Sequence, residues 1–213
     1  DSQRLRNIFF ELINQGAHNI NLVTATHFLP AVIEALEPGM PVPVVYNCGG
    51  YEKTESLDKL RGMVDIYLPD VKYMINSVAG RYSSAPDYPE RVKEAVECMY
   101  EQVGDCEFDD KGMLKKGVVV RHLVLPSNVE NSLAVIDWFE RFSKGKKVLF
   151  SLMGQYVPMG RAADFPEIDR RLTEEEYDGV CSWLELAGIK DGFVQELTAA
   201  DKGFVPDFDL SGV

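Results

Sequence analysis

Hydrophobic positions along the chain follow two alternating patterns. Long segments repeat apolar residues at spacings of three and four, which predicts amphipathic helices. Short runs between them are continuously apolar, which predicts strands that are covered on both faces. We expect helices over residues 3–15, 28–37, 54–60, 89–103, 129–143 and 173–188, and strands over residues 19–24, 43–46, 64–68, 118–125 and 147–152.

This alternation predicts an α/β fold of parallel strands joined by right-handed crossovers, with the helices outside. Five strands are too few for a closed eight-stranded barrel, and a doubly wound sheet also fits the pattern. The last helix has a clear start, since Thr173 and Glu176 form a capping box and Leu172 with Tyr177 fits a hydrophobic staple. The loop over residues 153–172 is long enough to be functional.

The length of 213 residues suits one domain, which we place over residues 1–195. Residues 196–213 form a polar tail with scattered aromatic residues, which we expect to lie over the barrel or to reach a partner. The first residues resemble neither a signal peptide nor an initiator methionine, so we expect a processing or cloning boundary there.

Charge and cysteine content narrow the classes of partner. A net charge of −12 argues against nucleic acid or an anionic membrane surface, because both require basic patches. No apolar run approaches the roughly 20 residues of a membrane span. The four cysteines have no pair at the spacing of a zinc site or a redox dithiol, so we expect free thiols and a cytoplasmic protein.

Polar side chains follow every expected strand at its carboxyl end. Ligands of parallel α/β folds bind at this end of the sheet. We therefore expect one binding face there. Its candidates are Thr24, Ala25, Thr26 and His27 after the first strand, Asn47, Cys48, Gly49, Gly50 and Tyr51 after the second, Asp70, Lys72 and Tyr73 after the third, Arg121, His122, Pro126, Ser127 and Asn128 in and after the fourth, and Met153, Gly154, Gln155 and Tyr156 after the fifth.

Spacing predicts how some of these side chains are arranged. Asp70 and Lys72 are two positions apart at a strand end, so they point to the same side and bind a polar ligand or each other. Arg121 and His122 are consecutive, so one enters the barrel and the other faces a helix.

Plainer interpretations stay open for several candidates. Lys72 also fits a solvated lysine, His27 a helix start, Cys48 a packed small hydrophobe, and Gly49 with Gly50 a tight turn. The sequence has no convincing His/Asp/Glu metal triad, nucleophile elbow, phosphate-binding glycine loop or dinucleotide fingerprint.

Seven segments occur in the order and spacing of a known family. They read QGAHNINLVTATHFLPAVIEAL, PVVYNCGGYE, VDIYLPDVKY, SSAPDYPERVKEAV, VVVRHLVLPSNVEN, FSLMGQYVP and RRLTEEEYDGV. Over residues 3–190 the chain thus resembles the later part of the radical S-adenosylmethionine family related to pyruvate formate-lyase activating enzyme. The resemblance implies a partial (β/α)6 TIM-like barrel. It also implies a 4Fe-4S cluster that cleaves S-adenosylmethionine to a 5′-deoxyadenosyl radical.

The chain also differs from this family in its sequence. The CxxxCxxC loop that holds the cluster is absent, and the chain begins in the helix that would follow it. We therefore expect the chain to lack the barrel's first strand, to bind no complete cofactor set and to be inactive alone. Thr24 to His27 stand where the family usually has a glycine-rich turn with an acidic residue.

The family's cofactor contacts carry over to matching positions only. The resemblance implies that S-adenosylmethionine is bound by Thr24, Thr26, Asn47, Cys48, Asp70, Lys72, Arg121, His122, Gln155 and Tyr156, with no metal ligand and no assigned catalytic residue. It implies as substrate a glycyl-radical enzyme or a small molecule.

Two other functions fit the sequence. One is a non-catalytic, partner-binding barrel fragment, with dimer contact over the exposed edge of the strand at residues 19–24. The other is an aldolase-like barrel in which Lys72 forms a Schiff base, although Asp70 beside it would favour the charged lysine.

Overall fold

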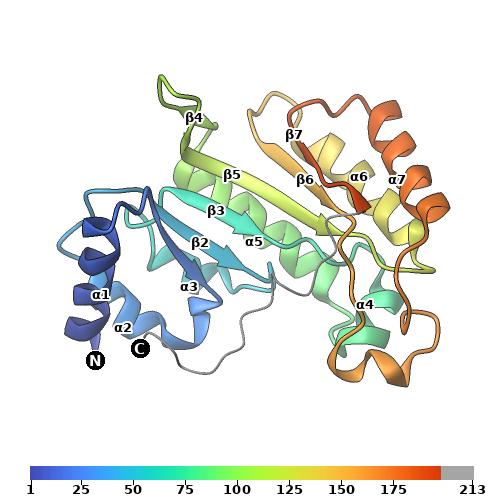
Figure 1. Cartoon of the computed structure of the whole chain (residues 1–213), viewed down its shortest axis with the longest axis horizontal. Helices are drawn as coiled ribbons and strands as arrows, with labels where there is room; N and C mark the ends of the chain where they lie inside the picture. Colours follow the sequence, from blue (N-terminus) through green and yellow to red (C-terminus); the bar gives the residue numbers. More distant parts are fainter. Residues whose placement is uncertain (198–213) are drawn as a thin grey trace.

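The computed structural model describes residues 1–197, which form one sheet with helices packed against it (Figure 1). Six strands follow one another in sequence order across the sheet, and every neighbouring pair on this path is parallel. They are β1 (Ile20–Val23), β2 (Val44–Cys48), β3 (Ile66–Pro69), β5 (Leu114–Leu123), β6 (Leu149–Met153) and β7 (Gly192–Val194). This is the order of a partial TIM-like barrel, so the expected α/β class and the five parallel strands are confirmed.

Two strands were not expected from the sequence. The two-residue strand β4 (Glu107–Phe108) pairs antiparallel with the start of β5, as Figure 1 shows beside the label β4. The three-residue strand β7 extends the sheet beyond β6. Both are exposed and too short to show a hydrophobic period, and tertiary pairing alone makes them strands.

The predicted helices are present, with small shifts at their ends. They are α1 (Ser2–Asn14), α2 (Leu29–Leu36), α3 (Thr54–Asp58), α5 (Tyr88–Val103), α6 (Val129–Phe142) and α7 (Glu174–Leu186). The capping box of Thr173 and Glu176 begins α7 as expected. The sequence pattern did not predict α4 (Asn76–Ser83) or the 3-10 helices η1 (Ala25–Phe28) and η2 (Gly160–Asp164).

The two faces of the sheet carry different residues. Alternate strand residues such as Tyr46, Val120 and Phe150 join one core cluster with apolar residues of the helices. The alternate set points away from that cluster, because successive side chains of a strand point to opposite faces. We call this second side the inner face. Cross-strand register places on it Val23, Asn47, Leu68, Asp70, Arg121, Ser151 and Phe193.

The inner face is exposed at both ends of the sheet. Val23 of β1 is 64% exposed and Phe193 of β7 is 59% exposed. The expected dimer contact over β1 stays a prediction. The expected role of the tail also stays a prediction, because residues 198–213 lie outside the described part of the chain. No helix within residues 1–197 is long and apolar enough to cross a bilayer.

Candidate functional site

Three predicted site residues meet on the inner face at the carboxyl end of the sheet. Arg121 of β5 donates a hydrogen bond from Nη2 to Oδ1 of Asn47 in β2, over 2.6 Å. The same Nη2 lies 2.6 Å from Oδ1 of Asp70, directly after β3. Each side chain of this ion pair keeps about a quarter of its surface exposed, 24% for Arg121 and 27% for Asp70. One guanidinium thus joins three strands at a position open to a ligand.

This cluster is not saturated with hydrogen bonds. Nε of Arg121 is buried and has no hydrogen-bond partner within the described residues, and neither has Oδ1 of Asp70, despite its charge contact. Oε1 of Gln195, which follows β7, is also buried without a partner in that part of the chain. Buried polar groups are normally satisfied, so Arg121 marks a place where a polar ligand would complete the bonding.

His122, the neighbour of Arg121, lies on the opposite side of the sheet. Its Nδ1 is 2.7 Å from the carbonyl oxygen of Val71 and its Nε2 is 2.9 Å from Oγ of Ser132 in α6. Burial lowers the pKa of His122 to about 4, so the ring is neutral and links two segments of the core. The prediction that the two consecutive residues face opposite sides is confirmed. His122 is therefore removed from the inner face.

Two other buried side chains fix the backbone around Asp70. The hydroxyl of Tyr88 lies 2.8 Å from the carbonyl oxygen of Gly49 and 2.6 Å from that of Asp70, and it accepts a bond from the amide of Lys72. Asn131 donates to the carbonyl oxygen of Lys72 and accepts from the amide of Met74. Neither residue was predicted, since an isolated Tyr or Asn in a helix carries no local signal of such a role.

Gly50 makes the close approach of the β2 loop to β3 possible. Its φ is +76°, and a Cβ atom there would lie 2.5 Å from the carbonyl oxygen of Asp70. Only glycine adopts this backbone region without strain and leaves the space free. The expected tight turn is therefore present, and it also positions the loop beside Asp70.

Lys72 and Cys48 lie away from the cluster. Lys72 is exposed, and Asp70 forms its ion pair with Arg121. The two residues therefore do not bind each other. Cys48 is 2% exposed and belongs to the core on the helix side, where burial raises the pKa of its thiol. Cys48 is thus a packed small residue, the plainer of its two interpretations.

The two threonines after β1 differ in their surroundings. Thr24 is exposed and has a left-handed backbone conformation. Its amide N–H donates a hydrogen bond to the carbonyl oxygen of Asn47. Thr26 lies in η1 and bonds to Tyr46 and to Glu52, a buried carboxyl group that the sequence analysis missed. Glu52 follows β2 by four residues, and its position after a strand was the signal available for it.

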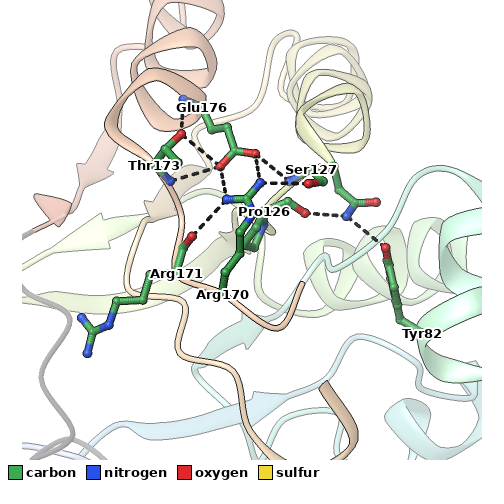
Figure 2. A network of polar contacts seen from close by, with 8 residues as sticks. Tyr82, Pro126, Ser127, Arg170, Arg171, Thr173 and Glu176 are labelled. Atoms are coloured by element: carbon green, nitrogen blue, oxygen red, sulfur yellow. Dashed lines mark hydrogen bonds and ion pairs between the residues drawn. The ribbon is translucent and has the colours of Figure 1, made fainter. Parts of the chain in front are cut away.

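The long loop after β6 is held by two anchors. Tyr156 is buried and donates to the carbonyl oxygen of Ile168, so it closes the loop on itself. Gln155 beside it is partly exposed. At the far end, Figure 2 shows Arg170 between Ser127 and Glu176, with bonds of 2.7 and 2.9 Å to the two carboxylate oxygens. This pairing lowers the pKa of Glu176 to about 2 and ties the loop to α7 and to the segment before α6.

The described residues offer no site for an iron–sulfur cluster. Within residues 1–197 no group of three or more His, Cys, Asp or Glu side chains is placed to hold a metal ion. The four cysteines are free, as expected, and three of them are buried.

Comparisons with known proteins show what the chain resembles. No family model matches it. In sequence it is 33% identical over 147 residues to an uncharacterized protein of Methanocaldococcus jannaschii. That match covers 68% of this chain and 38% of the relative, so the chain spans well under half of the relative's length.

Comparison with solved structures agrees with the fold. A domain of pyruvate-formate lyase-activating enzyme from Bacteroides vulgatus superposes with a TM-score of 0.58 at 11% identity, covering 84% of this chain and 98% of that domain. Two structures of dihydropteroate synthase from Thermus thermophilus reach TM-scores of only 0.32 and 0.31. The chain therefore shares its fold with the activating-enzyme domain.

Proposed function

We propose that this chain is the S-adenosylmethionine-binding part of a radical S-adenosylmethionine enzyme, with its cofactor contacts at Asn47, Asp70 and Arg121. The observation that carries this proposal is the cluster on the inner face, where Arg121 contacts Asp70 and Asn47 and its buried Nε lacks a hydrogen-bond partner in the described residues. The shared fold with an activating-enzyme domain supports it.

The chemistry of the three side chains suits this cofactor. The methionyl end of S-adenosylmethionine carries an ammonium and a carboxylate group. A guanidinium binds carboxylates through charge-assisted hydrogen bonds, and the free Nε of Arg121 is such a donor. The carboxylate of Asp70 accepts from an ammonium group, and the amide nitrogen of Asn47 is a further donor. These residues would bind and orient the cofactor.

Cofactor cleavage is a separate matter. When bound to an iron–sulfur cluster, this cofactor supplies a carbon radical. The residues described here do not fit a cluster, because none of their cysteines has partners arranged to hold a metal. We therefore propose that this chain binds the cofactor without cleaving it. For the longer parent protein we propose radical chemistry on a glycyl-radical enzyme or a small molecule.

Calorimetric titration of the 213-residue chain with S-adenosylmethionine and S-adenosylhomocysteine tests the binding proposal. Arg121→Gln and Asp70→Asn are each expected to weaken binding about tenfold, the effect of one charged hydrogen bond. Arg161→Gln is the matched control, because Arg161 is exposed and, within residues 1–197, pairs with nearby Asp164 alone. Equal affinity in Arg121→Gln and Arg161→Gln would contradict the proposal.

Anaerobic reconstitution tests the proposal that the chain binds the cofactor without cleaving it. The chain is incubated with iron, sulfide, dithionite and S-adenosylmethionine, beside the protein translated with its upstream coding sequence. We expect 5′-deoxyadenosine from the longer protein only. Its formation by the short chain would contradict cleavage-free binding, and its absence from both would contradict the family assignment.

A partner-binding role is the second candidate, favoured by the position of β1. This strand ends the sheet, and its Val23 is 64% exposed. Unpaired edges recruit further strands. Sedimentation of the chain as a strict monomer at high concentration would contradict a dimer through this edge. The Schiff-base alternative finds no support, because Lys72 is exposed rather than held in an apolar pocket.

A further inference from the structure

Glu52 is a buried carboxyl group with little compensation. Only 8% of the residue is exposed, yet it forms no ion pair within residues 1–197. Among the described residues its hydrogen-bond partner is Thr26, whose hydroxyl oxygen lies 2.9 and 3.1 Å from the two carboxylate oxygens. A buried carboxylate normally has a cation or several donors around it. Glu52 therefore has acceptor capacity that the described chain leaves unused.

The donors and acceptors of Glu52, Thr26 and Tyr46 are unevenly matched. Thr26 has one hydroxyl proton, which it donates to Glu52, and its oxygen lies 2.9 Å from the hydroxyl of Tyr46. Tyr46 must then donate to Thr26, which leaves one further lone pair on the threonine oxygen. An ionised carboxylate offers about four acceptor sites, of which Thr26 occupies one. The cluster of Glu52, Thr26 and Tyr46 presents acceptors almost exclusively.

Thr26 and Glu52 of this cluster line a groove at the carboxyl end of the sheet, while Tyr46 is buried behind them. The groove has a volume of about 880 Å³, and its lining includes Thr26 and Glu52 beside Tyr51, Lys53 and Arg91. The ring of Tyr51 stacks on Tyr88, is 48% exposed and lines the same groove as Glu52. The groove thus offers a cation an exposed aromatic ring as well as a carboxyl group.

Groups around Glu52 are consistent with a cationic ligand. Burial raises the pKa of Glu52, while the bond from Thr26 and the nearby charge of His27 act in the opposite direction. The charge of Glu52 in turn helps to raise the pKa values of Tyr46 and Cys48, although burial is the larger cause for both. A ligand cation would remove the cost that burial places on the charged carboxylate.

We infer that Glu52, with Thr26 and Tyr46, is a binding site for the primary ammonium group of a substrate, such as a lysine side chain. A primary ammonium has three donors and no acceptor, which complements a cluster made of acceptors. This site is distinct from the inner-face cluster of Asn47, Asp70 and Arg121. The inference therefore does not depend on the proposed cofactor.

Titration by NMR with Nα-acetyl-lysine N-methylamide tests this inference, because the side chain is the probe's only charge. The matched neutral probe carries an acetylated side-chain nitrogen. We expect saturable binding of the charged probe alone, with shifts at Thr26 and Tyr51. Glu52→Gln is expected to weaken it about tenfold, the effect of one charged hydrogen bond.

Glu55→Gln is the control variant, because Glu55 is an exposed carboxylate in the same groove and its loss changes the net charge equally. It is expected to bind within about twofold of the original chain, as for a surface charge. Equal weakening by both variants, equal binding of the acetylated probe, or no saturation would each overturn the inference. Loss of S-adenosylmethionine binding in Glu52→Gln with unchanged lysine binding would also overturn it.

Discussion

At the carboxyl end of the sheet, buried polar groups on the two faces differ in whether they have hydrogen-bond partners. On the helix side, His122 and Tyr88 each use their polar atoms in short bonds to the main chain or to a neighbouring hydroxyl. On the inner face, Arg121 and Asp70 leave buried atoms without hydrogen-bond partners in the described residues. Consecutive residues, Arg121 and His122, fall on different sides of this division.

The difference separates groups that stabilise the fold from groups available to a ligand. Loss of a satisfied buried partner leaves other polar atoms uncompensated and costs the fold heavily. Loss of a group that is itself unsatisfied costs the fold less, and its effect falls on binding. Substitutions on the two faces should therefore differ in stability and in ligand affinity.

The largest effect is expected at Gly50. Gly50→Ala places a Cβ atom 2.5 Å from the carbonyl oxygen of Asp70 at a φ of +76°. We expect a loss of about 3–4 kcal/mol in the free energy of unfolding, or failure to fold. Gly49→Ala, where a Cβ atom meets nothing within 4 Å, is the control and should cost less than about 1 kcal/mol. Equal urea midpoints for the two variants would contradict the close approach.

Acid should destabilise the chain through His122. Its pKa is about 4 in the folded chain against 6.5 for the free side chain, so the unfolded state binds more protons between these values. Stability is therefore present above pH 6.5 and is lost as the pH falls to 4, by about 3 kcal/mol. His122→Gln should remove this part of the pH dependence in urea titrations. His18→Gln, which changes an exposed histidine, should keep it.

Tyr88→Phe should destabilise the chain by about 2 kcal/mol, because it removes the hydroxyl that bonds to three main-chain groups of the β2 and β3 loops. The control is Tyr51→Phe, which removes an exposed hydroxyl bonded to Asp87. It should lower the free energy of unfolding much less than Tyr88→Phe does. Equal losses in thermal unfolding would show that the buried hydroxyl does not hold the loops.

The smallest effect on stability is expected at Arg121. Arg121→Gln should cost about 1 kcal/mol or less, because the side chain is partly exposed and incompletely bonded. Arg170→Gln should cost about 2 kcal/mol, since Arg170 makes two bonds to the carboxylate of Glu176 and one to Ser127. If Arg121→Gln proved the more destabilising of the two in urea unfolding, the inner-face cluster would be structural.

Periodicity alone predicted most elements of the fold. The continuous apolar runs indicated the parallel strands β1, β2, β3, β5 and β6, and the long amphipathic pattern indicated α5 and α6, because these elements bury residues at fixed spacings. It did not predict β4, β7 or α4, which are short and depend on pairing or packing with distant segments.

The sequence predicted some features of the candidate site and not others. Strand ends identified Asn47, Asp70 and Arg121 as neighbours, because the carboxyl ends of parallel strands meet at one edge. The sequence did not decide that Asp70 pairs with Arg121 instead of Lys72, since that pairing joins residues 51 positions apart. Nor did it identify Glu52 as buried, because the burial of a loop carboxyl group depends on which helices and loops pack around it. Local spacing thus determined the elements and the edge where they meet, and tertiary packing decided which polar groups are satisfied and which remain for a ligand.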